Sequence, residues 1–576
     1  MLKLARYLKY YKLQVTIGPV FKLLEAIFEL IVPLIMANII DIGVKNGDTN
    51  YIAKQGVLLV ILGVTGLLSA LICQYSASFA SQGVGTILRR DLFHHINTLS
   101  HKEIDKIGTP SLITRMTSDI NQIQLAVAML IRLVIRAPFL VVGAMIMAST
   151  VSLKLSVIFF GAAVIIGLTL YIIMSKSVPF FKTIQKRLDR ISLISRENLR
   201  GNRVIRAFAR QDEEEEKFSK AAQELTDASI SAGRISVLLS PLTCIITNTA
   251  IALIIWFGGM NVNIGELSQG DIIALVNYMT QIMLATVVVA DLVVIFTRAS
   301  ASAQRINEIF ETKTSVTEEK AEKNPTAEND NAIEFRNVSF SYGEGEALKN
   351  VTFSIKKGET LGIIGGTGSG KSTFVNLIPR FYDATKGQVL VNGIDVKKYE
   401  IETLREKIGV VAQKTVLFKG SLRKNMHWGK EKATDEEIIK ALKIARSWDF
   451  VEKLPGKLDF DVAQGGKNFS GGQRQRLTIA RALVKQPDIL ILDDSFSALD
   501  FATDANLRKE LKEQTRGMTV VIVSQRASTI RNADKIVVLD EGECVGIGTH
   551  QELYKNCSEY REICLSQLQI ANGLLM

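Results

Sequence analysis

The sequence predicts two parts of different fold class: an α-helical membrane-spanning domain over residues 1–310 and an α/β domain over 332–576. Three observations lead to this division. The first part holds long apolar runs, and the remainder after 331 alternates apolar strands, turns and helices. The stretch 311–331 between them is acidic and polar with almost nothing to bury, which predicts a linker. A chain of 576 residues that is 47% hydrophobic is also too long for one core and too apolar to be wholly soluble.

Six apolar runs in the first part have the length of membrane spans, which is roughly 20 residues for a helix. Three of them contain no charged residue, and the other three contain one to three. In chain order the six predicted spans are 15–40, 56–80, 128–150, 155–175, 235–265 and 272–297.

Basic residues orient these spans. The three loops on the predicted outer side contain three lysines in total, whereas the segment 176–234 alone contains thirteen lysine or arginine residues. Because positive charge is retained on the cytoplasmic side, we expect a multi-pass protein of the cytoplasmic membrane with both termini in the cytoplasm. The opening residues place Lys3, Arg6 and Lys9 at helical spacing beside apolar residues, which predicts a helix on the inner membrane surface.

Composition also argues against several classes of protein. The net charge of +11 is spread over many segments rather than gathered in one patch, so a nucleic-acid partner is not expected. The five cysteines show neither CxxC pairs nor metal-ligand spacing, which favours a reduced cytosolic side. The first residues lack an uninterrupted apolar core, so a cleaved signal peptide is not expected either.

Two long cytoplasmic segments, 81–127 and 176–234, are expected to be helical throughout, because no cluster of glycine or proline interrupts them. They would extend the spans into the cytosol as rods. Within them, the stretches 109–120 and 196–216 combine a small apolar face with dense charge. Each stretch is either a solvated helix surface or a docking surface for another domain.

The α/β part contains a phosphate-binding loop. Residues 365–373, GGTGSGKST, match G-x-x-x-x-G-K-[ST] between the apolar strand LGII and the helical segment TFVNLI. Glycines allow backbone N–H groups to face a phosphate, Lys371 can reach the β and γ phosphates, and the Ser372 hydroxyl can ligate Mg²⁺. After another apolar strand, 489–492, Asp493 suits the carboxylate that holds the Mg²⁺.

A second motif, FSGGQRQR at 469–476, precedes the strand ILIL and its two aspartates. It resembles the signature motif of ATP-binding cassette (ABC) proteins. Six spans followed by one cassette resemble a half-transporter of the type I ABC exporter family, and the resemblance covers essentially the whole chain. It implies ATP and Mg²⁺ as cofactors and a coupled ATPase activity.

The resemblance also implies roles for individual residues. Tyr342 matches the aromatic that stacks on adenine, Gln413 matches the Q-loop glutamine that touches Mg²⁺, and Asp500 matches the D-loop aspartate that communicates across the dimer. Coupling helices are expected within 109–120 and 205–212. The full set implied for nucleotide and metal binding is Tyr342, Gly366, Thr367, Gly368, Ser369, Gly370, Lys371, Ser372, Thr373, Gln413 and Asp493.

In this family two cassettes bind two ATP molecules head to tail. The signature of one chain therefore serves the nucleotide held by the phosphate-binding loop of the other chain. The residues with this role are Phe469, Ser470, Gly471, Gly472 and Gln473.

Two positions depart from the family pattern. Asp494 stands where the family has a glutamate that polarises the attacking water, and Gln525 stands where it has a histidine that contacts the γ-phosphate. A carboxylate retracted by roughly 1.5 Å is a costly change, because misplacements of about 1 Å can lower a rate on the order of 100-fold. Glutamine can hydrogen-bond a phosphate but carries no titratable proton.

With these two departures, the chain resembles the degenerate subunit of a heterodimeric exporter, whose own site hydrolyses ATP slowly. The implied partner is a second half-transporter that carries the missing glutamate and histidine. Two alternatives stay open: a homodimeric lipid or peptide exporter, and a nucleotide-gated regulatory membrane subunit that does not pump.

The cargo expected from the resemblance is a lipophilic or amphiphilic compound of the multidrug type, taken from the cytosol or the lipid membrane. Glu25 and Glu29 share a helix face with Lys22, and Asp291 lies deep in the sixth span. Charges at membrane depth are costly and usually face a cavity or a partner. They are therefore either an acidic cavity surface that favours cationic amphiphiles, with Asp291 the main candidate, or a neutralised pair of Lys22 with one of the glutamates.

Overall fold

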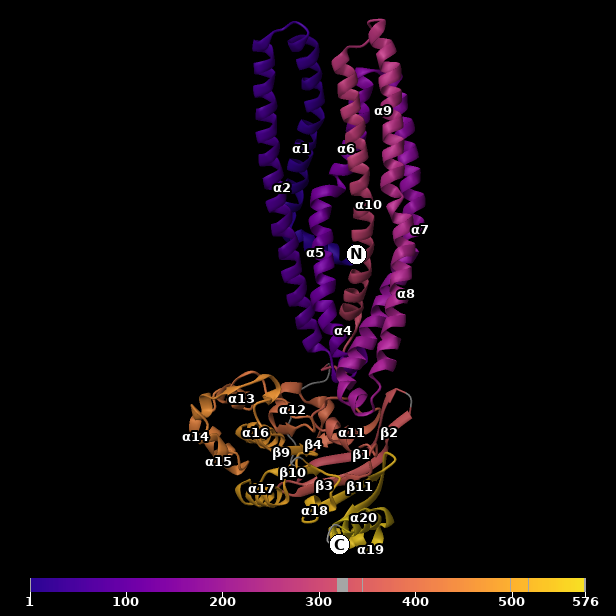
Figure 1. The fold of residues 1–576 in the computed structure, drawn as a ribbon. Helices are drawn as coiled ribbons and strands as arrows, with labels where there is room; N and C mark the ends of the chain where they lie inside the picture. The colour runs from indigo at the N-terminus through magenta and orange to yellow at the C-terminus, as the bar shows by residue number, and fades with distance from the viewer. Residues whose placement is uncertain (1, 319–329, 344, 498, 516, 574–576) are drawn as a thin grey trace. The chain divides into compact units, whose positions relative to one another are not determined.

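The structure is a computed structural model that describes every residue except 1, 319–329, 344, 498, 516 and 574–576. Two compact units form. The first contains the residues up to Asn97 together with Gly108–Thr312, and the second contains Thr98–Ile107 together with the residues from Lys313 onward. The first unit is helical and the second is α/β, so the predicted fold class is confirmed (Figure 1). Most of the predicted linker lies outside the described residues.

Long helices that run side by side make up the first unit (Figure 1). Six helical stretches in the described chain are long and apolar enough to cross a membrane, and five of them contain a predicted span in full, while the fifth in chain order ends at Asn263, two residues before the end of the predicted span 235–265. The helices of this unit are α1 (Lys12–Asn38), α2 (Thr49–Thr98), α4 (Thr109–Thr114), α5 (Ile120–Met129), α6 (Arg136–Val151), α7 (Leu153–Ala207), α8 (Gln211–Val237), α9 (Leu239–Asn263) and α10 (Gln269–Glu311).

Short segments of other helical types join these α-helices. The N-terminal surface helix is a 3-10 helix, Leu2–Tyr11, rather than an α-helix, and it buries Leu4 and Tyr7. Turns of π-helix are Ile39–Val44, Arg115–Asp119 and Leu130–Val134. Such turns leave the regular hydrogen-bond ladder and often mark functional sites.

Helices α1, α6 and α10 pack against one another around a core of small and aliphatic side chains, including Ala26, Leu30 and Ala144. The buried Tyr278 donates a hydrogen bond to the carbonyl of Leu30 at 2.8 Å. A Cβ on Gly270 would lie 2.4 Å from the carbonyl oxygen of Ala37, so only glycine permits this approach of α10 to α1. These contacts fix the three helices as one packed group.

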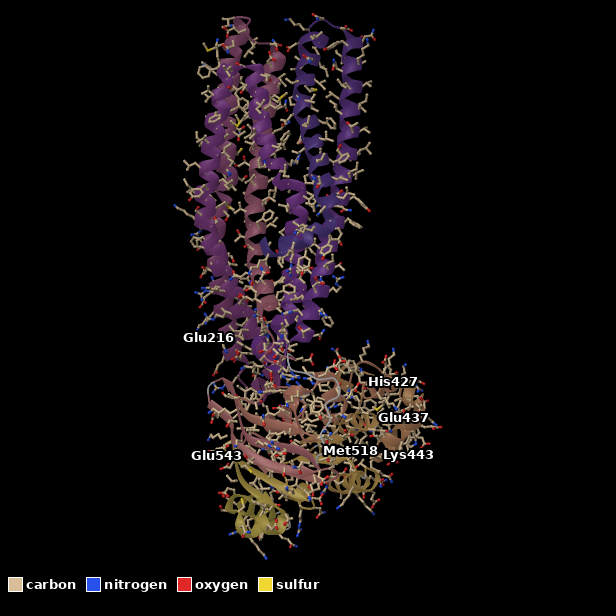
Figure 2. All side chains as sticks on the ribbon, turned by 180° about the vertical axis from the view of Figure 1, so that it is seen from behind. Glu216, His427, Glu437, Lys443, Met518 and Glu543 are labelled. Atoms are coloured by element: carbon tan, nitrogen blue, oxygen red, sulfur yellow. The ribbon has the colours of Figure 1, made fainter. Side chains whose placement is uncertain are left out.

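Apolar side chains project outward from the long helices (Figure 2). Leu67 and Trp256, for example, are 60% and 70% exposed in the single chain. Because soluble monomers rarely expose large apolar patches, such a surface is suited to lipid or to another membrane subunit.

The segments 81–127 and 176–234 are not helical throughout, which corrects the prediction. After α2 the chain breaks before the short helix α3 (His101–Ile107) and again at Gly108, whose φ of 81° is left-handed and which is followed by Pro110 in the first turn of α4. A single glycine close to a proline is thus enough to end a helix here. The second segment breaks between α7 and α8, where Ala209 has a φ of 51°.

The second unit is built on a six-stranded sheet with the order β12-β11-β3-β10-β9-β6, in which only the β11–β12 pair is antiparallel. A four-stranded antiparallel sheet, β2-β1-β4-β5, and the small β7–β8 pair accompany it. The strands are β1 (Asn331–Gly343), β2 (Gly345–Lys356), β3 (Thr360–Gly365), β4 (Lys386–Val391), β5 (Ile394–Asp395), β6 (Ile408–Val411), β7 (Gly420–Ser421), β8 (Asp461–Val462), β9 (Ile489–Asp493), β10 (Thr519–Val523), β11 (Lys535–Asp540) and β12 (Glu543–Gly548).

Two buried clusters, which contain Phe335 and Leu492 respectively, pack the sheets against the helices of this unit. Besides α3, these helices are α11 (Lys371–Leu377), α12 (Ile401–Glu406), α13 (Leu422–His427), α14 (Asp435–Ile444), α15 (Trp448–Val451), α16 (Gly471–Val484), α17 (Phe501–Gln514), α18 (Ala527–Ile530), α19 (His550–Asn556) and α20 (Ser558–Gly573).

The segment Thr98–Ile107 belongs to the second unit, although it lies between two spans in the sequence. Tyr382 donates a hydrogen bond to Asp105 at 2.8 Å, and the His101 ring lies 4.7 Å from the ring of Phe381. Burial and the nearby Arg405 guanidinium lower the pKa of His101, which favours its neutral form. The first expected coupling segment, 109–120, instead groups with the helices of the first unit.

The start of the predicted linker is also part of the second unit, contrary to the expectation that it has almost nothing to bury. Val316 is buried, and the buried Arg380 donates to the carbonyl of Thr317 at 2.7 Å. Ser100 and Ser315 share a hydrogen bond of 2.8 Å. This part of the chain is therefore held in place by specific contacts.

A buried carboxylate provides a test of the first unit. Asp119 is 3% exposed and accepts hydrogen bonds from Ser302 at 2.9 Å and from Arg305 Nε at 2.8 Å. Arg305→Ala would leave this charge without its cation, so we expect a loss of about 3–5 kcal/mol and a clearly lower Tm in detergent. The control is Lys3→Ala, which removes the exposed Lys3–Glu311 pair and should cost less than about 1 kcal/mol. Equal shifts in the two variants would contradict this account.

Candidate functional site

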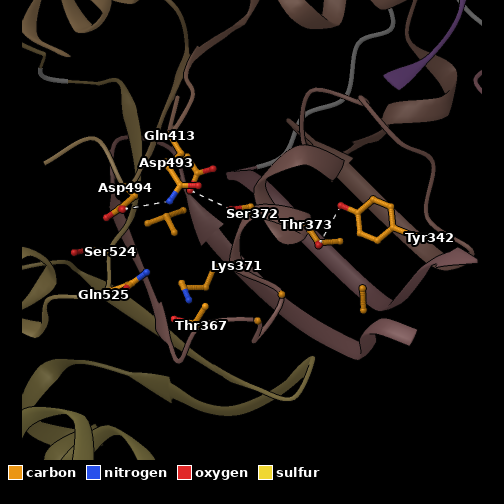
Figure 3. A pocket seen from close by; sticks show the side chains of 14 residues that line it. Tyr342, Thr367, Lys371, Ser372, Thr373, Gln413, Asp493, Asp494, Ser524 and Gln525 are labelled. Atoms are coloured by element: carbon orange, nitrogen blue, oxygen red, sulfur yellow. Dashed lines mark hydrogen bonds between the residues drawn. The ribbon is translucent and has the colours of Figure 1, made fainter. Parts of the chain in front are cut away.

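Four neighbouring parallel strands bring the predicted nucleotide residues together. The strands β3, β10, β9 and β6 are paired in parallel, so their carboxyl ends meet at one edge of the sheet. The phosphate-binding loop follows β3, Asp493 ends β9, Gln525 comes two residues after β10, and Gln413 comes two residues after β6. Residues more than a hundred positions apart thereby line a cavity of about 390 Å³ (Figure 3).

Glycine is required at the turn that forms the phosphate-binding loop. Gly368 and Gly370 have φ values of 84° and 95°, in the region that residues with a Cβ avoid. A Cβ on Gly370 would also lie 2.7 Å from the carbonyl oxygen of Ala347. A Cβ on Gly366 would meet no atom within 4 Å. The loop thus closes tightly at its end and is open at its beginning.

Lys371 begins α11 and folds back over the loop. Its Nζ donates to the carbonyl of Gly365 at 2.9 Å and to that of Gly366. Burial lowers the pKa of the Lys371 ammonium, and the nearby carboxylates of Asp494 and Asp493 oppose this effect. An anionic phosphate beside Nζ would likewise stabilise the charged form, so the loop suits a phosphate ligand.

The oxygens needed for Mg²⁺ lie together at the carboxyl end of β9. Ser372 Oγ is 3.5 Å from Asp493 Oδ1, and burial raises the pKa of the Asp493 carboxyl. Hydroxyl and carboxylate oxygens are the hard ligands that Mg²⁺ binds, and a cation would compensate the cost of a buried carboxylate. These two residues therefore fit the metal.

Asp494 and Gln525 line the same cavity as the phosphate-binding loop. The Gln413 amide points to Asp494 Oδ2 at 3.5 Å, which is the upper limit for a hydrogen bond. The backbone of Asp494 has a φ of 46°, a conformation that aspartate tolerates better than most residues. The fourteen lining residues include neither glutamate nor histidine (Figure 3).

Tyr342 lies at the far end of the cavity from Asp494 and Gln525 (Figure 3). Tyr342 is 48% exposed. The centroid of its ring lies 4.8 Å from that of Phe340 and 5.3 Å from that of Tyr382, both in edge-to-face geometry. Its hydroxyl shares a hydrogen bond of 3.2 Å with Thr373 Oγ1. An aromatic face held by its edges and open on one side is suited to stack on a planar base.

Sequence reasoning missed three lining residues. Ala347 on β2 contributes its backbone carbonyl beside Gly370. Val523 is the last residue of β10, and Ser524 follows it, directly before Gln525. The position of Gln525 at the end of an apolar strand could therefore have indicated both residues. Nothing in the local pattern around Ala347 indicates its place, because it reaches the site through the β1–β2 hairpin.

The signature residues do not line the cavity of their own chain. Ser470 caps α16. Its Oγ accepts a hydrogen bond from the backbone N–H of Gln473 at 3.2 Å, and Gln473 Oε1 accepts one from the backbone N–H of Ser470 at 2.9 Å. Phe469 is buried against Phe460, whereas Ser470 and Gly471 are exposed. The helix N-terminus is thus formed and open to a ligand from outside this cavity.

Asp500 is likewise outside the cavity. It caps α17 by accepting from the Thr503 amide at 2.9 Å and from the Thr503 hydroxyl at 2.8 Å. These hydrogen bonds lower the pKa of the exposed Asp500 carboxyl.

At membrane depth, two of the three predicted cavity carboxylates form ion pairs. Glu25 accepts from Lys22 at 2.7 Å, which is the neutralised pair considered above. Glu29 accepts from Arg136 Nη2 at 2.7 Å, a pairing that the sequence analysis did not anticipate. Asp291 on α10 is exposed. The expectation of a cationic cargo assumed free carboxylates, so only Asp291 still favours it.

The two ends of the phosphate-binding loop give a matched pair of variants. In Gly370→Ala the new Cβ would meet the Ala347 carbonyl and force a strained φ, so we expect the affinity for ATP·Mg²⁺ to fall by about tenfold or more. In Gly366→Ala the Cβ projects into open space, so affinity should stay within about twofold. Titration calorimetry on the detergent-solubilised chain would measure both, and equal losses would contradict the assigned geometry.

Both parts of the chain are similar to known protein families. Residues 15–287 match the family described as ABC transporter transmembrane region, and residues 348–497 match the family described as ABC transporter. The chain is 37% identical over 571 residues to an uncharacterized ABC transporter ATP-binding protein of Mycobacterium tuberculosis, covering 98% of this chain and 97% of that protein. It is also 37% identical to the uncharacterized ABC transporter ATP-binding protein YfiB of Bacillus subtilis, covering 98% of each chain.

A more distant relative is an ATP-dependent lipid A-core flippase of Desulfotalea psychrophila, which is 35% identical over 494 residues, or 84% of this chain and 86% of that one. Among solved structures, a bacterial Atm1-family ABC exporter with ATP bound superimposes with a TM-score of 0.82 at 23% identity, over 98% of this chain and 99% of that chain. The chain therefore belongs to the ABC transporter family, as a multi-pass half-transporter that joins one transmembrane region to one ATP-binding domain in the fold of an ABC exporter.

Proposed function

We propose that this chain is one half of a heterodimeric exporter that uses ATP to move lipophilic or amphiphilic compounds, of the multidrug type, across the cytoplasmic membrane. Both termini and the ATP-binding domain lie in the cytoplasm in this proposal. The chain contributes the phosphate-binding loop of a slow, degenerate ATP site. It also contributes the intact signature of the competent site, whose phosphate-binding loop belongs to the partner.

One observation carries the proposal. The cavity around the phosphate-binding loop holds Lys371, Ser372 and Asp493, but the side chains available to act on water and on the γ-phosphate are Asp494 and Gln525. Aspartate is one methylene shorter than glutamate, so its carboxylate is retracted from the attacking water. Glutamine has no titratable proton. A site with these residues is suited to hold ATP and poorly suited to split it.

Magnesium belongs to the same proposal. Ser372, Gln413 and Asp493 would hold it, and its charge would compensate the phosphates. Tyr342 would stack on the adenine, while the backbone amides between Gly366 and Thr373 would bind the phosphates.

The exposed signature supports a second cassette as partner. Ser470 and Gly471 present the N-terminus of α16 away from the chain's own cavity, and such a terminus attracts a phosphate. A partner that carries the glutamate and histidine absent here would place a hydrolysable ATP against it. The competent site would then power the cycle, while this chain's site stays occupied for longer.

Lipid is the second cargo considered, because a relative is named a lipid A-core flippase. A regulatory subunit that only gates a partner is the remaining alternative. ATPase measurements on the co-expressed complex separate it from a pump: we expect turnover in the intact complex and its loss when Ser470→Arg blocks the signature. Negligible turnover in the intact complex would end the pump proposal.

The Ser470→Arg background also isolates the site of this chain. Within it, Asp494→Glu should raise single-turnover hydrolysis by less than about tenfold, because Gln525 still faces the γ-phosphate. Adding Gln525→His should bring the total gain to the order of 100-fold. Rapid-quench assays with radiolabelled ATP would measure both steps. A full gain from Asp494→Glu alone would show that Gln525 does not limit the reaction.

A further inference from the structure

We infer that a pocket between α1, α6 and α10 binds the acidic head of an anionic amphiphile, which is the class of cargo that this half of the transporter selects. The inference rests on the proposed export function and narrows it. It concerns residues of the first unit only.

The pocket is small and has one polar side. Its volume is about 110 Å³, which is enough for an acidic head with the first carbons of its tail. Glu29, Arg136 and Gln281 supply the polar side, and six apolar residues supply the rest of the wall: Leu133, Ala137, Leu140, Leu284, Ala285 and Val288. An amphiphile matches this division, with its head on the polar side and its tail along the apolar wall.

Two charged side chains line this pocket, Glu29 and Arg136, and they are paired with each other. The charges just outside it are of both signs. Lys22 and Glu25 form an ion pair on α1, Arg132 donates to the Ser78 hydroxyl at 3.3 Å, and Asp291 lies three residues after Val288 on α10. A preference for an acid therefore depends on the hydrogen-bond donors of Arg136 rather than on a surplus of positive charge.

Two buried polar atoms at the pocket have no partner within the described chain, namely Arg136 Nε and Gln281 Oε1. The edge of the Arg136 guanidinium formed by Nε and Nη2 is half used, since Nη2 donates to Glu29 and Nε has no partner. Gln281 Nε2 donates a hydrogen bond to the backbone carbonyl of Glu29 at 3.1 Å. This bond orients the Gln281 side chain and leaves Gln281 Oε1 without a partner in the described chain. An unsatisfied buried polar group costs about 1–3 kcal/mol, and more if it is charged, so a ligand that pairs with both atoms is favoured.

Other classes of cargo fit less well. A quaternary ammonium head could not accept the hydrogen bond of Arg136 Nε. A neutral hydroxyl head can pair with both buried atoms, but its hydrogen bond with the guanidinium lacks the strength that the charge of a carboxylate adds. A carboxylate or phosphate head accepts from Arg136, and a neighbouring N–H or O–H on the head can donate to Gln281, as in an N-acyl amino acid.

Three probes with the same dodecyl tail test this inference: N-dodecanoylglycine, dodecyltrimethylammonium and dodecanol. Equilibrium binding of each labelled probe is measured on the full chain in lipid nanodiscs without nucleotide. We expect the anionic probe to bind at least about tenfold more tightly than the other two. Arg136→Gln should lower its affinity by about tenfold, and Gln281→Leu should lower it by a smaller factor.

Two matched variants control for charge. Arg132→Gln removes a neighbouring cation that does not line the pocket, and it should change affinity by less than about threefold. Asp291→Asn removes the exposed acid and should leave binding of the anionic probe intact. An unchanged Tm and elution profile in detergent confirm that each variant is folded.

Equal binding of the three probes, or equal losses in Arg136→Gln and Arg132→Gln, would overturn the inference. Tighter binding of the cationic probe that is lost in Asp291→Asn would overturn it in favour of a cationic cargo. These assays use neither the partner nor hydrolysis. Their failure would therefore leave the proposed ATP-driven export standing, and that proposal fails separately if the complex shows no turnover.

Discussion

Parallel pairing of β3, β10, β9 and β6 is the constraint on which the nucleotide site depends. The four strands end at the same edge, and each is followed within two residues by a residue of the cavity. A shift of one residue in this register would move each side chain of β9 to the opposite face of the sheet, and because all five residues of β9 are buried, both faces would have to be repacked. The cores on both faces of the sheet thus fix where Asp493 and Gln525 stand.

This constraint is compatible with the proposed degenerate site, because it would allow reactive groups to be lost while the form of the site is kept. Asp494 and Gln525 lie beyond the strand ends, so their side chains do not pack in the core and can differ without disturbing the sheet. The loop geometry depends instead on Gly368 and Gly370, and the metal position depends on Ser372 and Asp493. In the proposed function, binding and hydrolysis would therefore depend on different residues, and only those for hydrolysis depart from the family pattern.

Sequence patterns predicted the fold class and the residues of the cavity because both depend on local features. Apolar runs have the length of a membrane, and the phosphate-binding loop needs glycine at fixed positions. Features that depend on contacts between distant segments were not predictable. The Glu29–Arg136 pair joins residues 107 positions apart, and the place of Thr98–Ile107 in the second unit follows from packing against Phe381 and Tyr382. The break at Gly108 had a local signal, one glycine close to a proline, which was too weak to be decisive.

Charged side chains at membrane depth are costly unless other groups of the protein pair with them. Here the paired groups come from three helices, α1, α6 and α10. Arg136 on α6 holds Glu29 on α1, and Gln281 on α10 holds the carbonyl of the same Glu29. The polar contacts that join the three helices are thus made by the side chains that line the small pocket between them. A head that binds Arg136 must share the guanidinium with Glu29, because both draw on the same few donors. Occupation of this pocket and the packing of α1 against α6 are therefore coupled through one side chain, which gives cargo a direct physical route to the arrangement of the spans.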